Sequence, residues 1–427
     1  MRAKLYTPFL VALMVAVVLA SCGSDEGGTT GQGTKVEGAK TLDPAKVEAA
    51  KGDVTWCIGK DTTGAYKKSV AAYNKSQSNV KAKLLELPES ADEQRTQLIQ
   101  RLRAKSDECD VVGMDVVWTA EFAGQKWLYD LTSALESRKS EFIPSTLETA
   151  TFDDKIFGAP YNTNAGFIYY RTDKGLKAPS SWEEVYSSAK DKGGFGYMGA
   201  DYEGLTVSFL ELLYSAGGSA ISEDGSKSAV NSDVVAKEVL TFMADGVEDG
   251  AVPKAVTTYM EEENRRAFES GQITQMRNWP YAIALGNESK IKGKFKFATF
   301  PSYKGGEPSG VLGGFNLGIS AFSKNPEAAM SFANFLSGEM GQRFQAQTAT
   351  PPVLESAYED AATKKTLPAK QLRKAIAQAK PRPVSPVYPQ ITEAIHKNVH
   401  AALTGDAEPD AAIEKMSEDI DKAINTF

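Results

Sequence analysis

The fold is decided between residues 53 and 115, which read DVTWCIGKDTTGAYKKSVAAYNKSQSNVKAKLLELPESADEQRTQLIQRLRAKSDECDVVGMD. Short runs rich in β-branched and aromatic residues alternate here with longer stretches whose apolar residues recur at helical spacing. The pattern predicts strands and helices in alternation, at Val54–Ile58, Tyr66–Ser76, Val80–Leu87, Glu93–Lys105 and Asp110–Met114. This order predicts a parallel sheet with helices on both faces. Ligands of such sheets bind beyond the carboxyl ends of the strands, where Asp61 and Asp115 stand.

The same alternation resumes after Pro160 and continues toward the C-terminus. It predicts strands at Gly166–Tyr170 and Asn316–Ser320, a helix capped by Ser181, and a helix at Pro326–Leu336. No period of 20 to 50 residues repeats, so the pattern excludes a solenoid or a propeller.

Length and composition limit the classes of protein that need to be considered. The chain has 427 residues, of which 42% are hydrophobic, as in an ordinary folded protein of two or three domains. Two large lobes would leave a cleft of the kind that holds small ligands. A net charge of −7, spread along the chain, argues against nucleic acid as a partner. With three cysteines and two histidines, we expect no metal site and no cofactor.

The N-terminal segment is typical of a lipoprotein signal peptide, which we place at residues 1–21. Basic Arg2 and Lys4 precede an apolar run, Phe9–Ala20, that is too short to span a bilayer, which needs roughly 20 residues. Small residues before Cys22 form a lipobox, and its cysteine resembles those that are diacylated after cleavage by signal peptidase II. An ordinary secretory signal or a short anchor is the alternative. The Gly-rich polar sequence that follows predicts a flexible tether over residues 22–52.

Export would place Cys57 and Cys109 in an oxidising compartment. A disulfide between them is then one possibility and two buried free thiols the other, since sequence does not supply the Cα separation that decides.

Several motifs together carry a resemblance to a known family. They are Asp115-Val-Val-Trp-Thr-Ala-Glu-Phe-Ala123, Tyr202-Glu-Gly-Leu205, Arg277-Asn-Trp-Pro-Tyr281, Gly313-Gly-Phe-Asn316 and Pro381-Arg-Pro-Val384, all downstream of the lipobox. In this order they resemble the extracellular solute-binding protein family 1 of ABC importers, in particular its trehalose/maltose-binding branch. The resemblance implies an α/β fold of the two-lobed periplasmic-binding-protein type (type II, maltose-binding-like) with three crossings between the lobes. One lobe would hold residues 53–160 plus 312–350 and the other 161–311 plus 351–427.

The resemblance also implies roles for individual residues in a sugar site. Carboxylates, amides and guanidinium groups suit sugar hydroxyls, which donate and accept at once, and an aromatic face suits the apolar face of the ring. Asp115 and Glu203 would accept from hydroxyls, Trp279 would stack, and Arg382 would donate two hydrogen bonds. Gly313 and Gly314 would let the backbone approach the ligand beside Phe315. Asp61 and Asn164 complete the set, although many relatives carry an aspartate near Asn164.

Each of these residues also has a purely structural interpretation that the sequence leaves open. Asp115 could cap a helix, Glu203 could be a solvated charge at a helix start, and Trp279 could be a core aromatic residue. Gly313 and Gly314 could form a bulge or hinge, and Arg382 could be an ordinary surface arginine.

We therefore expect a monomeric, lipid-anchored binding protein on the outer side of the cell membrane. It would capture an oligosaccharide, such as the disaccharides trehalose or maltose, by hinge closure and deliver it to the transmembrane subunits of an ABC permease. The alternatives are a sugar-sensing receptor subunit and an exported carbohydrate-active enzyme, for which the Asp153-Asp154 pair could supply carboxylates. We expect no enzyme activity. His396 and His400 lie four residues apart and could bind zinc, but a solvated helix face is the favoured interpretation.

Overall fold

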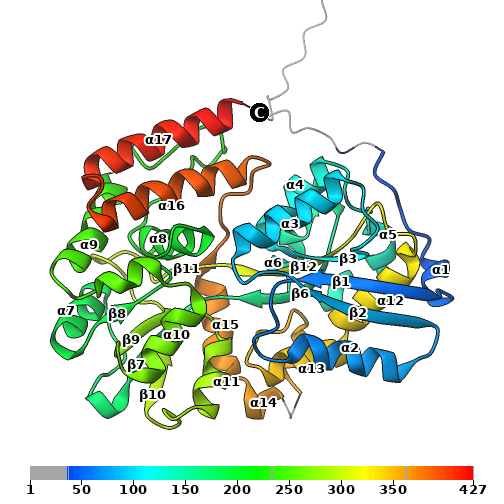
Figure 1. The fold of residues 1–427 in the computed structure, drawn as a ribbon, viewed down its shortest axis with the longest axis horizontal. Helices are drawn as coiled ribbons and strands as arrows, with labels where there is room; N and C mark the ends of the chain where they lie inside the picture. The colour runs from blue at the N-terminus through cyan, green and yellow to red at the C-terminus, as the bar shows by residue number, and fades with distance from the viewer. Residues whose placement is uncertain (1–35, 37, 232–233, 361–362, 427) are drawn as a thin grey trace, which may run out of the picture. The chain divides into compact units, whose positions relative to one another are not determined.

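The computed structural model describes residues 36, 38–231, 234–360 and 363–426 (Figure 1). They belong to one compact unit that spans residues 35–427. The predicted signal peptide (1–21) and its lipobox cysteine Cys22 lie outside the described residues. Within the described part, no helix has the length and apolar character that a membrane crossing requires.

The first sheet has five strands in the order β2-β1-β3-β12-β6. The strands are β1 (Gly52–Ile58), β2 (Val80–Glu86), β3 (Val111–Asp115), β6 (Ala159–Asn164) and β12 (Gly313–Ile319). As predicted, β1 is parallel to β2 and β3. β12 runs antiparallel to both β3 and β6.

Helices cover both faces of this sheet, as the alternation predicted. Successive side chains of a strand point to opposite faces. Val54 and Trp56 pack in one cluster with Phe332 of α12 (Pro326–Ser337), while Cys57 packs in another with Leu98 of α3 (Ala91–Arg103). The further helices of this lobe are α2 (Ala65–Ser76), α4 (Thr119–Gly124), α5 (Thr132–Leu135), α6 (Pro144–Thr149) and α13 (Glu339–Gln347). A short hairpin joins β4 (Thr151–Phe152) to β5 (Lys155–Ile156).

Cys57 and Cys109 are joined by a disulfide, with their Cα atoms 5.6 Å apart. Cys57 lies in β1 and Cys109 precedes β3, and these neighbouring strands bring the two sulfur atoms together. Both residues are buried on the side of the sheet that α3 covers.

The predicted tether is too long at its C-terminal end. Val36, Leu42 and Val47 are buried, and the short helix α1 (Pro44–Glu48) contacts α12. The Lys40 ammonium donates to the carbonyl oxygen of Ala321 at 2.6 Å. These apolar side chains pack into the core clusters of the first lobe, so the segment from Val36 to Val47 belongs to that lobe.

The second sheet has four strands in the order β10-β7-β9-β8. They are β7 (Phe167–Arg171), β8 (Phe195–Gly196), β9 (Gln275–Asn278) and β10 (Phe295–Ala298). On one side of the sheet lie α7 (Trp182–Lys192), α8 (Glu203–Ser215) and α9 (Val234–Glu248). On α8 and α9 pack, in turn, α16 (Tyr388–Thr404) and α17 (Pro409–Asn425). On the other side lie α10 (Glu261–Ser270), α11 (Tyr281–Glu288) and α15 (Ala369–Gln378). The Ser181 hydroxyl accepts from the backbone N–H of Glu184 at 3.2 Å, which confirms the predicted cap of α7.

Among the residues that the structure describes, the chain passes between the two lobes three times, and two of these passages differ in position from the predicted boundaries. β6 continues to Asn164, so the first passage follows that residue rather than Pro160. The second leads from β11 (Gly310–Val311), which pairs with β13 (Ala379–Lys380), into β12 near the predicted residue 312. The third lies beyond the predicted residue 350, because Val353 and Leu354 still pack in the core of the first lobe. Figure 1 shows β6, β11 and β12 in this middle region.

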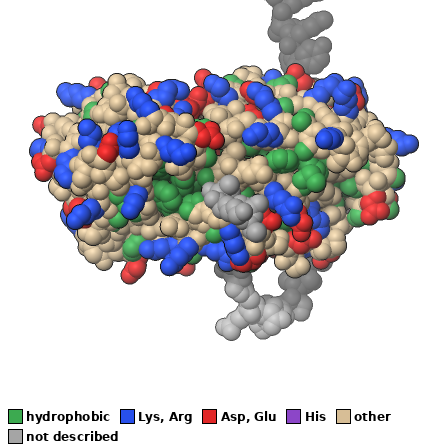
Figure 2. Space-filling model, turned by 90° about the horizontal axis from the view of Figure 1, so that it is seen from below, with side chains coloured by type: hydrophobic (Ala, Val, Ile, Leu, Met, Phe, Trp, Pro, Cys, Tyr) green, Lys and Arg blue, Asp and Glu red, His purple; other side chains and the backbone are tan. Residues whose placement is uncertain are grey.

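On the face drawn in Figure 2, charged side chains of both signs lie around smaller hydrophobic areas.

Candidate ligand-binding site

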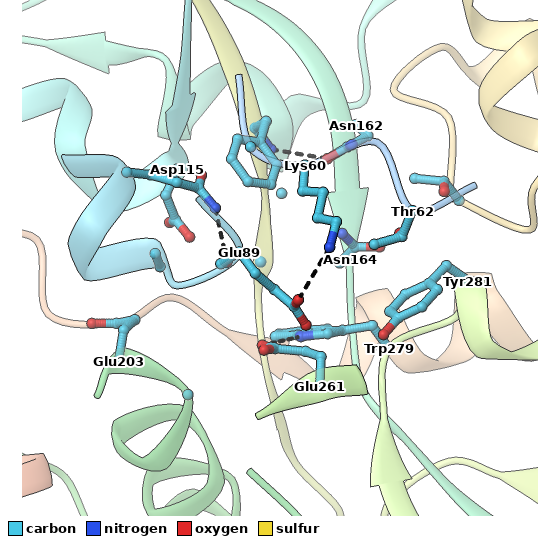
Figure 3. Close-up of a pocket in the computed structure, with 18 of the residues that line it drawn as sticks. Lys60, Thr62, Glu89, Asp115, Asn162, Asn164, Glu203, Glu261, Trp279 and Tyr281 are labelled. Carbon is cyan, nitrogen blue, oxygen red and sulfur yellow. Dashed lines mark hydrogen bonds and ion pairs between the residues drawn. The ribbon is translucent and has the colours of Figure 1, made fainter. Parts of the chain in front are cut away.

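A solvent-open cleft of about 1160 Å³ lies between the two lobes. Its wall takes residues from the loops after β1, β2 and β3 in one lobe and from α8, α10 and the β9–α11 connection in the other (Figure 3). All nine residues that the sequence singled out for a ligand line it, namely Asp61, Asp115, Asn164, Glu203, Trp279, Gly313, Gly314, Phe315 and Arg382. The carboxyl ends of parallel strands meet at one edge of a sheet, which brings Asp61 and Asp115 together.

Arg382 connects carboxylates of both lobes at the inner end of the cleft. Its Nη2 donates to Asp115 Oδ1 at 2.5 Å and its Nη1 donates to Glu203 Oε1 at 2.7 Å. The arginine is only 3% exposed, so the interpretation as a surface residue is wrong. Burial raises the pKa of Asp115, and the charge of Arg382 opposes that rise.

The carboxylate of Glu203 is occupied by protein donors. Besides Arg382, the Tyr388 hydroxyl donates to its Oε1 and the Thr392 hydroxyl to its Oε2, both at 2.6 Å. Glu203 is 5% exposed, which excludes the interpretation as a solvated charge. These contacts make Glu203 an anchor for Arg382, and they leave it less free to accept from a ligand than the sequence suggested.

Asp115 combines the two roles that the sequence left open. Its Oδ1 accepts from the backbone N–H of Val117 at 3.2 Å, which caps the short helical turn η1 (Val116–Trp118). The same carboxylate pairs with Arg382 and lines the cleft. Capping and cleft position are therefore compatible at this residue.

Trp279 is half-buried at the cleft wall and is held from several sides. The Arg277 guanidinium lies 3.9 Å from the ring centroid, and Arg277 itself forms a fully buried ion pair with Glu211. The indole N–H donates to Glu261 Oε1 at 3.4 Å, and the Tyr169 hydroxyl donates to the Trp279 carbonyl oxygen at 2.7 Å. Figure 3 shows the ring beside Tyr281. A guanidinium covers one ring face, which leaves the other face for the cleft.

Gly313 and Gly314 lie where a larger residue would collide with other parts of the protein. A Cβ on Gly313 would lie 3.0 Å from Cη2 of Trp279, so the absence of a side chain admits the indole. Gly314 has a φ of +134°, and a Cβ there would lie 2.3 Å from the carbonyl oxygen of Asn162. The pairing of β12 with β6 shifts register just after Phe315, which agrees with the bulge interpretation. Asn164 pairs with Gly313 across this ladder.

Asp61 has one carboxylate oxygen engaged and one without a partner among the described residues. Its Oδ2 accepts from the backbone N–H of Lys67 at 2.9 Å, in the first turns of α2. Its Oδ1 is buried and has no protein donor within the described part of the chain. This oxygen is a candidate acceptor for a ligand, because buried polar atoms in folded proteins normally have a partner.

Sequence reasoning missed part of the cleft wall. The missed residues include Lys60, Glu89, Gln94, Asn162, Tyr202, Glu261, Glu262, Tyr281, Gln345 and Thr350. Lys60 and Glu89 follow β1 and β2, so the strand-end rule that selected Asp61 could have found them. Burial and the Glu263, Glu262 and Glu261 carboxylates of the opposite lobe raise the pKa of Glu89. Glu261 and Glu262 open α10, which carries no ligand signal in the sequence.

Two other sequence expectations are corrected by the structure. Asp153 and Asp154 form the turn between β4 and β5 and do not line the cleft, and Asp153 accepts from the backbone N–H of Val36 at 2.6 Å. The solvated-face interpretation of the histidines is wrong for His396, which is buried, with its Nδ1 2.6 Å from Asp201 Oδ1. Within the described residues, no group of three His, Cys, Asp or Glu side chains could hold a metal ion.

Two lobes around a polar cleft with an aromatic wall define the class of periplasmic-type binding proteins. The family model of the bacterial extracellular solute-binding protein matches residues 59–343, and the chain belongs to this family. A probable ABC transporter-binding protein of Deinococcus radiodurans is 34% identical over 376 residues, covering 82% of this chain and 88% of that protein. A galactooligosaccharide-binding protein of Bacillus subtilis is 23% identical, covering 97% of this chain and 96% of that protein.

A solved structure of maltose-bound MalE3 of T. maritima superposes with a TM-score of 0.82 at 34% identity, covering 86% of this chain and 98% of that one. The two-lobed maltose-binding-like fold that the motifs implied is therefore confirmed. The family consists of substrate-binding proteins of ABC transporters, so the chain is a binding protein and the enzyme alternative is rejected.

Proposed function

We propose that this protein captures an oligosaccharide, such as the disaccharides maltose or trehalose, and delivers it to the permease of an ABC importer. The observation that carries the proposal is the cleft itself, which combines the half-buried ring of Trp279 with carboxylates from both lobes and amides from the first lobe. Sugars need this combination of an aromatic face and groups that accept from hydroxyls. The similarity to a maltose-bound protein at 34% identity supports a disaccharide of this kind.

The mechanism that we propose is capture by closure of the lobes. A ligand that contacts both walls of the cleft binds the closed state better than the open state, and so it shifts the population toward closure. The permease would recognise the closed, loaded protein. No bond is made or broken, and the cleft residues act by binding the ligand or by positioning the groups that bind it.

The test is a thermal-shift screen of the chain from residue 35 onward against maltose, trehalose and trisaccharides. A ligand at 100 times its dissociation constant adds about 2.7 kcal/mol to the free energy of unfolding. We expect at least one saccharide to raise the melting temperature and sulfate or amino acids to leave it unchanged. A panel in which only non-saccharides stabilise the protein would reject the proposal.

We further propose that Cys22 carries lipid and holds the protein, as a monomer, on the outer side of the cell membrane. An acidic protein does not itself adhere to anionic lipid, so acyl chains would have to provide the attachment. Cys22→Ala should abolish labelling by a fatty-acid probe and release the protein from membranes. A labelled Cys22→Ala variant would contradict the anchor.

A further inference from the structure

Helix α8 receives a cap from the opposite lobe. Its first residue is Glu203, and its own N-cap residue, Tyr202, makes no side-chain cap hydrogen bond. Asp92, in the first turn of α3, accepts from the backbone N–H of Glu203 through Oδ2 at 3.1 Å. α3 covers the five-stranded sheet and α8 packs on the four-stranded sheet, so this hydrogen bond joins the two lobes.

The charges of both helices favour a carboxylate at this position. The N-termini of α3 and α8 both carry partial positive charge, and each lies beside Asp92. On balance the pKa of Asp92 is raised, because burial and the Glu203 carboxylate outweigh the opposing effects of His396, the Glu203 N–H and Arg95. The Arg95 guanidinium already pairs with Glu121, with Nε donating to Oε2 at 2.8 Å. Its charge is therefore shared between Glu121 and Asp92.

Asp92 lies outside the wall of the ligand cleft. It lines a second, solvent-open pocket between α3 and α16, to which Arg95, Trp118, Tyr388 and His396 also contribute. Glu203 lines both cavities. Removing the Asp92 side chain therefore leaves the surface that faces a ligand in place, while it breaks a contact between the lobes.

We propose that Asp92 is an interlobe latch, a positioning residue that stabilises the closed arrangement by capping α8 and so sets affinity without touching the ligand. The effect of the latch on the arrangement of the lobes does not depend on the proposed function. Its effect on saccharide affinity does rest on that function. The apparent dissociation constant is the intrinsic constant divided by the fraction of protein in the binding-competent state. A mutation that breaks the latch must therefore raise the dissociation constants of all ligands by the same factor. Loss of a direct ligand contact raises them by different factors.

The first test needs no ligand. Small-angle X-ray scattering of the ligand-free chain from residue 35 onward should give a larger radius of gyration for Asp92→Ala than for the wild type. Glu93→Ala is the matched control, because Glu93 is an exposed carboxylate of the same helical turn, and it should scatter like the wild type. Asp92→Asn keeps an acceptor oxygen and should stay close to the wild type, since asparagine caps helices about as well as aspartate. Equal radii for Asp92→Ala and the wild type would overturn the latch.

The second test uses calorimetric titration with maltose and trehalose. Asp92→Ala should raise the dissociation constant of each saccharide that the wild type binds by the same factor, about tenfold, because hydrogen bonds to charged groups are the stronger ones. Unequal factors, or no change, would overturn the latch while leaving the binding function standing. If the wild type binds no saccharide, the proposed function is rejected. The scattering comparison would still show whether Asp92 holds the two lobes together. Asp92→Leu, which also lacks an acceptor oxygen, replaces Asp92→Ala in both tests if Asp92→Ala fails to fold.

Discussion

Arg382 Nη2 lies 2.5 Å from Asp115 Oδ1, and the two residues are 267 positions apart in the sequence. Asp115 ends β3 of the first lobe, whereas Arg382 follows β13 on the way to the C-terminal helices. The same guanidinium reaches Glu203 at the start of α8. One buried cation thus holds two carboxylates, one from each lobe, at the inner end of the cleft.

Arg382→Met should destabilise the fold. It leaves Asp115 and Glu203 buried without their cation, and removing one partner of a buried ion pair costs about 3–5 kcal/mol of unfolding free energy. Chemical denaturation measures the loss. Arg373→Met is the matched control, since Arg373 pairs with Glu355 at the exposed surface and should change stability by less than about 0.5 kcal/mol. Similar losses for both variants would contradict the assignment of Arg382 to the buried cluster.

Trp279→Ala should weaken saccharide binding at least tenfold and leave the fold intact. The aromatic contact is worth about 0.5–1.5 kcal/mol beyond its buried area, and each 1.4 kcal/mol is a factor of ten in affinity. Trp182→Ala is the comparison, because Trp182 is buried and stacks on Phe300 with ring centroids 5.5 Å apart. That variant should lose about 3–5 kcal/mol of stability. A large fall in the ligand-free melting temperature of Trp279→Ala with unchanged affinity would show that Trp279 is a core residue.

Gly313→Ala should displace the indole of Trp279. The new methyl group would lie 3.0 Å from Cη2, and the Arg277 guanidinium 3.9 Å from the ring centroid limits how the ring can move. We expect weaker saccharide binding and a changed tryptophan emission spectrum. Gly124→Ala, in α4, meets no atom within 4 Å and should leave both unchanged. If Gly313→Ala also left affinity and emission unchanged, the close packing of Gly313 on Trp279 would be wrong.

Glu89→Gln should stabilise the protein at pH 7.5 and not at pH 4. Burial and the Glu261–Glu263 carboxylates raise the pKa of Glu89, so the folded state binds its proton more tightly than the unfolded state. Below the ordinary value of 4.5 both states are protonated and the ionised form costs nothing. As the pH rises above that value, the folded state is penalised, and glutamine removes the penalty. Melting curves at the two pH values test whether Glu89→Gln raises the melting temperature only at pH 7.5. The exposed Glu93→Gln is the control. An equal change in melting temperature at both pH values would contradict the raised pKa of Glu89.

Local sequence determined the elements of the first lobe and the residues at their ends. The strands around Trp56, Val80 and Val112 and the helices between them follow from apolar periodicity, because each element buries one face. The strand-end rule then predicted Asp61 and Asp115 at the cleft, the quoted motifs added six more residues that line it, and the family resemblance added Asn164. These signals are local in the chain, so a single sequence carries them.

Only the tertiary structure decided the partners of those residues. Sequence spacing does not reveal that Glu203 is occupied by Tyr388 and Thr392, that Arg277 lies beneath Trp279, or that Gly313 makes room for the indole. Nor does it reveal that Asp92 of one lobe caps a helix of the other, 111 positions away. Each of these contacts joins segments that are distant in the sequence, and the free energy of such a contact depends on distance, burial and neighbouring charge, which exist only once the chain has folded.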